Sequence, residues 1–91
     1  MSTETAAEDK LIRLWIESNP HKPGPEDAWV LPRYVPIWAL IGQLELDGWR
    51  TLAVAGDYKL PREAVEAAIA YYRRHRAAID ERIRRNRASF A

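Results

Sequence analysis

Arginines gather near the C-terminal end of this 91-residue chain. The guanidinium group of arginine is planar and carries several donors, which suits it to bidentate contact with carboxylate or phosphate. The candidates for contact with an anionic partner are Arg82, Arg84, Arg85 and Arg87. On a helix, Asp80 and Glu81 stand four residues before Arg84 and Arg85, which leaves Arg82 and Arg87 without a local acidic neighbour.

Charge is distributed unevenly along the whole chain. Residues 1–47 contain four Lys or Arg against eight Asp or Glu, a net charge of −4. Residues 48–91 contain ten against five, a net charge of +5, and the total is +1. This asymmetry predicts a basic C-terminal half that meets an anionic partner. The alternative interpretation is a solvated helix with more arginine than acid.

A second group of cations accompanies a pattern typical of a helix-turn-helix. Two expected helices, 51–56 and 61–72, are joined by four residues, and Lys59 stands where glycine usually permits a left-handed turn. The candidate phosphate contacts are Arg50, Lys59 and Arg62. The exposed start of the second helix is expected to present Arg62, Glu63, Glu66 and Ala67. Two carboxylates approach phosphates poorly, so DNA binding is the weaker hypothesis.

Nothing in the sequence predicts catalysis. There is no cysteine, the two histidines lie far apart, and the acidic residues lack a glycine-rich loop. We therefore expect no catalytic, cofactor-binding or metal site, and no enzyme activity. The N-terminus lacks the apolar segment of a signal peptide, and the longest apolar stretch is too short to span a bilayer. These features predict a soluble cytoplasmic protein with no membrane partner.

The chain divides into three segments. Residues 1–18 are expected to form a helix that begins with a capping box at Thr5 and Glu8 and ends at Asn19. Residues 19–34 form a proline-rich arm, anchored by Trp29, with an extended edge segment at 29–31. Residues 35–91 form the helix-turn-helix core with a long C-terminal helix. The fold class is therefore all-α, a small helix-turn-helix domain with an extended N-terminal arm and a long C-terminal helix.

Two apolar patterns define the helices of the core. Residues 37, 40, 41 and 44 form a stripe on a helix that Pro36 begins and Gly48 ends. The last helix runs from Pro61 to about Arg87, about 40 Å, and carries a heptad seam. Its outer members, Ile79, Ile83 and Phe90, outrun the domain and predict a homodimer. The alternative is a helix that stops near Asp80 and frays.

Two stretches resemble a known family. The sequence VPIWALI at 35–41 and the sequence DYKLPREAVEAAIAYY at 57–72 are similar to bacterial domain-of-unknown-function family 433. The match covers about residues 29–78. The arm differs, with DAWVLPR at 27–33 in place of the family's Gly-Lys-Pro and Gly-Thr-Arg. The resemblance implies a helical, homeodomain-like or winged-helix-like fold. It also implies an antitoxin role, because many members are considered antitoxins encoded beside PIN-like ribonuclease toxins.

Three hypotheses follow from these patterns. The first is a non-enzymatic binding protein that resembles an antitoxin and inserts arginine into the metal-binding carboxylates of a PIN-like toxin. Its expected partner-binding residues are Ile79, Arg82, Ile83, Arg84, Arg85, Arg87 and Phe90. The second is a dimeric DNA-binding transcriptional regulator that uses Arg50, Lys59 and Arg62. The third is a purely structural dimerisation module.

Overall fold

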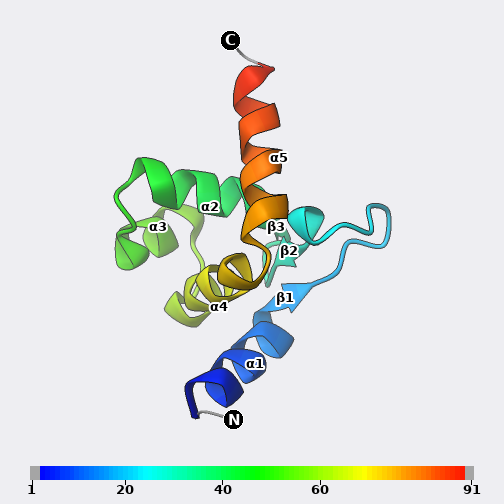
Figure 1. Cartoon of the computed structure of the whole chain (residues 1–91). Helices are drawn as coiled ribbons and strands as arrows, with labels where there is room; N and C mark the ends of the chain where they lie inside the picture. Colours follow the sequence, from blue (N-terminus) through cyan, green and yellow to red (C-terminus); the bar gives the residue numbers. More distant parts are fainter. Residues whose placement is uncertain (1–2, 90–91) are drawn as a thin grey trace.

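The computed structural model describes residues 3–89, which form five α-helices, one 3-10 helix and three short strands (Figure 1). In chain order the elements are α1 (Thr3–Trp15), β1 (Ile16–Glu17), the 3-10 helix η1 (Pro25–Asp27), β2 (Trp29–Val30), β3 (Val35–Pro36), α2 (Ile37–Leu46), α3 (Thr51–Tyr58), α4 (Arg62–Arg74) and α5 (Arg76–Ala88).

The apolar stripe of α2 is confirmed as the core. Its four members, Ile37, Leu40, Ile41 and Leu44, are fully buried. The helix ends at Leu46, and Gly48 follows in the left-handed conformation with φ 69°. Trp49 is also left-handed, with φ 62°, and its N–H donates to the carbonyl of Leu44 at 2.8 Å. Gly48 therefore lies directly after the C-cap residue Asp47 and ends the helix in the left-handed conformation, as predicted, and two successive positive φ angles turn the chain towards α3.

The arm forms a small antiparallel sheet in the order β1-β2-β3. Val30 pairs with Ile16 on one side and with Val35 on the other. The prediction of an edge strand is wrong, because Pro32 lies beyond β2 and its missing N–H does not interrupt the ladder. Val30 and Ala28 are the buried anchors, whereas Trp29 is half-buried against the ring of Tyr34. The fold is thus mostly helical with one small sheet.

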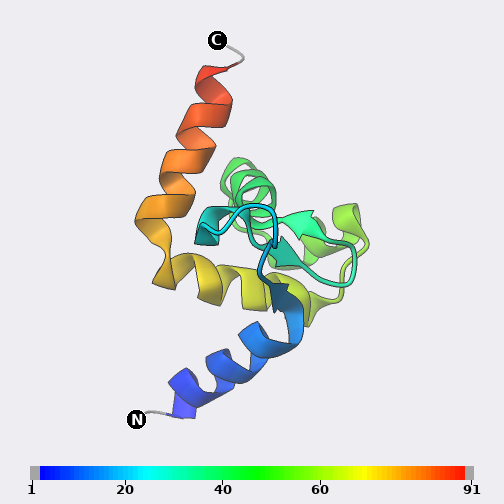
Figure 2. The same ribbon diagram turned by 90° about the vertical axis from the view of Figure 1, so that its right-hand side faces the viewer.

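Helix α1 packs against α4 (Figure 2). It begins at Thr3 and ends at Trp15, so the expected bounds at Thr5 and Asn19 are wrong. The helix stops early because residues 16 and 17 pair with β2. None of its described side chains is fully buried. Its acidic side is held by Arg74, which lies 2.6 Å from Asp9.

The expected single C-terminal helix is two helices that meet at His75. This residue has φ −130° and ψ 33°, outside helical geometry, and its N–H is shared between the carbonyls of Tyr71 and Tyr72. The bend turns α5 back onto α2, where Ile79 and Ile83 are buried. Each buried side chain contributes roughly 1.5–3 kcal/mol, and the bend interrupts the helix at one residue only.

This bend overturns two expectations for the end of the chain. Ile79 and Ile83 do not form an exposed seam, so the expected homodimer loses the surface on which it rested. The alternative of a helix that frays near Asp80 is also wrong, because α5 continues to Ala88. Phe90, the last expected member of the seam, lies outside the described residues.

The buried position of Ile79 predicts a large effect on stability. Substitution Ile79→Ala leaves a cavity between α5 and α2 and is expected to lower the free energy of unfolding by about 2–5 kcal/mol. Urea unfolding followed by circular dichroism measures this change. Leu52→Ala, at an exposed side chain of α3, is the control and should change it by less than about 0.5 kcal/mol. Equal effects of the two substitutions would contradict the packing of α5.

Candidate functional site

The candidate site is the arginine-bearing surface of α5, whose C-terminal half projects from the rest of the molecule (Figure 1). The helix contains five arginines against two carboxylates. The structure separates the four predicted arginines into two kinds. The side chains of Arg84, Arg85 and Arg87 are 66%, 57% and 53% exposed, whereas that of Arg82 is only 23% exposed.

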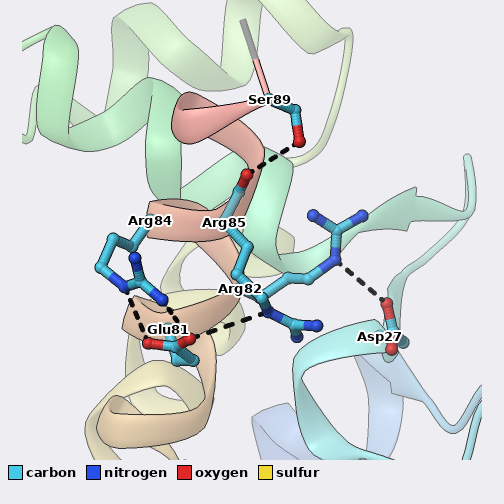
Figure 3. A network of polar contacts seen from close by, with 6 residues as sticks. All are labelled: Asp27, Glu81, Arg82, Arg84, Arg85 and Ser89. Atoms are coloured by element: carbon cyan, nitrogen blue, oxygen red, sulfur yellow. Dashed lines mark hydrogen bonds and ion pairs between the residues drawn. The ribbon is translucent and has the colours of Figure 1, made fainter. Parts of the chain in front are cut away.

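Arg84 and Arg85 share one carboxylate (Figure 3). The guanidinium of Arg84 donates to both oxygens of Glu81, at 2.6 and 2.9 Å. This hydrogen bonding lowers the pKa of Glu81 and raises that of Arg84. Arg85 reaches the same carboxylate only at 3.9 Å. One negative charge therefore faces two positive charges, and a positive surplus remains exposed.

The predicted pairing along α5 is confirmed only in part. Glu81 contacts Arg85 four residues later, as expected, but its shorter contact is with Arg84. The predicted pair of Asp80 with Arg84 is wrong, because Asp80 accepts a hydrogen bond from the hydroxyl of Tyr72 at 2.7 Å. This bond ties α4 to α5 next to their junction.

Arg82 and Arg87 lack a local acidic partner on α5, as predicted, and are held instead by distant parts of the chain. The guanidinium of Arg82 lies 4.1 Å from the ring centroid of Trp38 and 3.8 Å from a carboxylate oxygen of Asp27. Arg87 lies 3.3 Å from Glu45 on α2. Because all these partners precede residue 48, sequence neighbours could not reveal them. Arg82 in particular joins α5 to α2 and η1.

The predicted phosphate contacts lie at both ends of α3: Arg50 precedes the helix, whereas Lys59 and Arg62 flank the turn between α3 and α4. Lys59 has φ 55°, which confirms its left-handed conformation. The side chain of Arg33 donates to the Lys59 carbonyl at 3.2 Å, so a fourth cation that the sequence did not indicate joins this group. Arg50 and Arg62 line one hollow of about 340 Å³, although each has an acidic neighbour. Arg50 lies 2.6 Å from Asp47, which raises the pKa of Arg50, and Arg62 lies 3.4 Å from Glu66.

Helix α1 covers much of the outer face of α4. Ala67, predicted to be exposed, is fully buried. It lies on the helical face of Ala70 and Arg74, where α1 contributes Leu11 and Asp9. With α1 in this position, the exposed residues of α4 lie in its first turn, at Arg62 and Glu63, and at its C-terminal end, at Arg73 and Arg74. The sequence missed this contact because α1 and α4 are about fifty residues apart.

Aromatic and charged groups support the junction of α4 and α5. The ring of Trp49 stacks on that of Tyr72 at 5.8 Å, and Arg76 lies 5.1 Å from the centroid of the Tyr72 ring. Burial, together with the hydrogen bond to Asp80, raises the pKa of Tyr72 to about 12. The phenol therefore remains protonated and donates to Asp80 throughout the neutral range.

Metal-binding clusters and membrane-spanning helices are both absent from the described part of the chain. Between residues 3 and 89, no group of three or more His, Asp or Glu is arranged to hold a metal ion. Over the same residues, every helix is too short or too polar to cross a bilayer. Comparison of the chain with protein-family models, with curated proteins and with solved structures gives no match.

The raised pKa of Tyr72 predicts a specific loss of stability at high pH. An unfolded tyrosine ionises near pH 10, so above this pH the unfolded state loses a proton that folded Tyr72 retains. The contribution of Tyr72 is complete below about pH 10 and is lost progressively up to about pH 12. Urea unfolding across this range should show a smaller decrease for Tyr72→Phe than for the natural chain. Equal decreases in the free energy of unfolding for Tyr72→Phe and the natural chain would contradict the raised pKa of Tyr72.

Proposed function

We propose that this chain is a non-enzymatic protein-binding module whose partner presents a carboxylate-rich surface. The observation that supports the proposal is the exposed positive surplus on the projecting end of α5. Arg84 and Arg85 share Glu81, and more than half of each side chain is exposed. Surface positions such as these allow a partner to approach both guanidinium groups without disturbing the core.

The existing ion pairs of this surface are easily exchanged. Exposed ion pairs contribute about 0–1 kcal/mol, and the contact of Arg85 with Glu81 is long at 3.9 Å. A partner carboxylate that excludes water from Arg85 replaces a weak contact by a stronger one, because charge-assisted hydrogen bonds strengthen as water is removed. Arg85 is therefore the principal partner-binding residue in this proposal, and Arg84 supports it.

The proposed partner is a PIN-like ribonuclease toxin. This part of the proposal rests on the resemblance of residues 35–41 and 57–72 to the antitoxin-like family. Such toxins hold their metal in a cluster of carboxylates, which is the chemistry that a guanidinium recognises. An arginine of α5 in that cluster would compete electrostatically with the metal ion. Arg82 has a positioning role, since Trp38 and Asp27 already hold it.

Copurification with the product of the adjacent gene tests this proposal. The double substitution Arg84→Ala/Arg85→Ala should weaken the complex at least about tenfold, which corresponds to about 1.4 kcal/mol. The control Lys10→Ala/Arg13→Ala removes two exposed cations from α1 and should leave the affinity unchanged. If the two double variants bind equally well, α5 is not the contact surface.

DNA binding is the second candidate function, and the left-handed turn at Lys59 is the observation that favours it. In this proposal α3 and α4 form a helix-turn-helix, and Arg50, Lys59 and Arg62 contact phosphates together with Arg33. Phosphate contacts release counterions, so the affinity for duplex DNA should fall steeply as salt increases. Titrations at low and moderate salt measure this dependence. An affinity that is flat over this range would eliminate the hypothesis.

A further inference from the structure

A hollow lies at the junction of α4 and α5, next to Trp49. It has a volume of about 310 Å³ and combines two aromatic rings with two guanidinium groups. The rings are those of Trp49 and Tyr72, the cations are Arg73 and Arg76, and Ile69 completes the lining. None of these described lining residues is acidic. Aromatic surface beside positive charge is the chemistry that binds a nucleobase and its phosphate.

The position of Trp49 is only partly explained by packing within the chain. Its φ of 62° is left-handed, a conformation that is unfavourable for a bulky side chain and that glycine adopts freely. Its ring stacks on that of Tyr72, at 5.8 Å and with 29° between the planes. Trp49 nevertheless remains 42% exposed. A large ring is therefore presented at a strained backbone position, and such positions are concentrated at binding sites.

Arg76 is the cation that the fold leaves available at this hollow. Every other arginine of α4 and α5 lies 3.9 Å or less from a carboxylate oxygen of a described residue. Among residues 3–89, Arg76 forms no ion pair, and its guanidinium lies exposed at 5.1 Å from the centroid of the Tyr72 ring. Asp80, four residues later, instead accepts a hydrogen bond from the Tyr72 hydroxyl at 2.7 Å. Asp80 and Glu45, the carboxylates that act on this hydroxyl, line a different hollow.

Arg73 adds a second, partly compensated charge from α4. Its side chain is 61% exposed and lies 3.4 Å from Glu8 on α1. Glu8 also lies 3.6 Å from Arg74, whose shorter contact is with Asp9 at 2.6 Å. Three arginines, counting Arg76, therefore meet two carboxylates of α1. The surplus positive charge is that of Arg76, directly beside the two rings.

We propose that this hollow binds an unpaired nucleobase together with its adjoining phosphate, in single-stranded nucleic acid or in a free nucleotide. The base stacks on Trp49, and the phosphate lies against Arg76 with Arg73 beside it. An unpaired base is required, because a base within a duplex does not offer its flat face to a side chain. A carboxylate of a protein partner would use Arg76 alone, whereas a nucleotide uses the ring and the cation together. The site contains none of the residues of the proposed protein-binding surface and does not depend on that function.

A fluorescein-labelled strand of about twelve thymidines provides the probe, and fluorescence anisotropy measures its affinity for the full chain at low salt. Trp49→Leu keeps an apolar side chain next to Tyr72 but has no aromatic face. We expect this substitution to weaken binding about fivefold or more, the loss typical of one stacking ring. Trp49→Phe keeps a ring and should restore most of the affinity. An abasic strand of the same length and a blunt duplex should both bind more weakly than the thymidine strand.

Arg76→Gln tests the phosphate contact separately. It should weaken binding about fivefold or more, and it should reduce the slope of log affinity against log salt by about 0.7 for one lost phosphate contact. Arg13→Gln is the matched control, because Arg13 is an exposed arginine of α1 and its loss changes the net charge equally. The control should bind within about twofold of the natural chain. Both substitutions are at exposed positions, so Arg76→Gln remains a test of the hollow even if Trp49→Leu fails to fold in a thermal melt.

Competition identifies the source of the ligand, and several results would overturn the site. Displacement of the strand by thymidine monophosphate at an equal nucleotide concentration supports the site and identifies a free nucleotide; displacement by unlabelled strand alone identifies single-stranded nucleic acid. Absence of binding at millimolar strand overturns the proposal, and so does equal binding by the abasic strand or by a folded Trp49→Leu. Equal binding by Arg76→Gln excludes the phosphate contact. If Trp49→Leu releases a copurified protein and the natural chain does not bind the strand, the hollow is a protein-binding surface and the proposal is wrong.

Discussion

The burial of Ile79 and Ile83 against α2 is the interaction on which the rest of the structure depends. A straight helix from residue 62 to residue 88 would carry both side chains away from the core, so the chain bends at His75. The bend sets the direction of α5, and α5 in turn determines where its arginines lie. The bend also creates a hollow between α2 and α5, lined among others by Trp38, Gly42 and Arg87, because α5 forms one of its walls.

The charge asymmetry of the sequence is largely compensated within the fold. Acidic residues of the N-terminal half meet arginines of the C-terminal half at four places: Glu8 and Asp9 contact α4, Asp27 contacts Arg82, Glu45 contacts Arg87, and Asp47 contacts Arg50. A net difference in charge between two halves of a chain therefore does not measure what remains for a partner. The two exposed arginines that share Glu81 account for the surplus on α5, and they carry the proposed function.

Helix α1 has a similar consequence for the basic group around the turn between α3 and α4. The turn itself has the left-handed residue that its sequence predicts, but α1 lies on the outer face of the helix that would read a groove. Its contacts combine half-buried apolar side chains with exposed ion pairs, and the ion pairs contribute little individually. The hypotheses of protein binding and DNA binding thus use different ends of the molecule, one open and one partly covered.

The sequence by itself determined the local features: the buried stripe of α2, the left-handed Lys59, the short helix before it and the mostly helical composition. Each of these depends on residues within one or two turns of each other, so periodicity and backbone preference suffice. Only the tertiary structure decided that the last helix breaks at His75, that β2 is a central strand, and that Arg82 and Arg87 are held by residues some forty to fifty-five positions earlier. No proline or glycine marks the break, because its cause is the apolar surface of α2. At His75 the free energy of burying Ile79 and Ile83 against α2 outweighs the local preference for a continuous helix. The sequence pattern does not indicate this break, because it contains no information on which distant residues pack together.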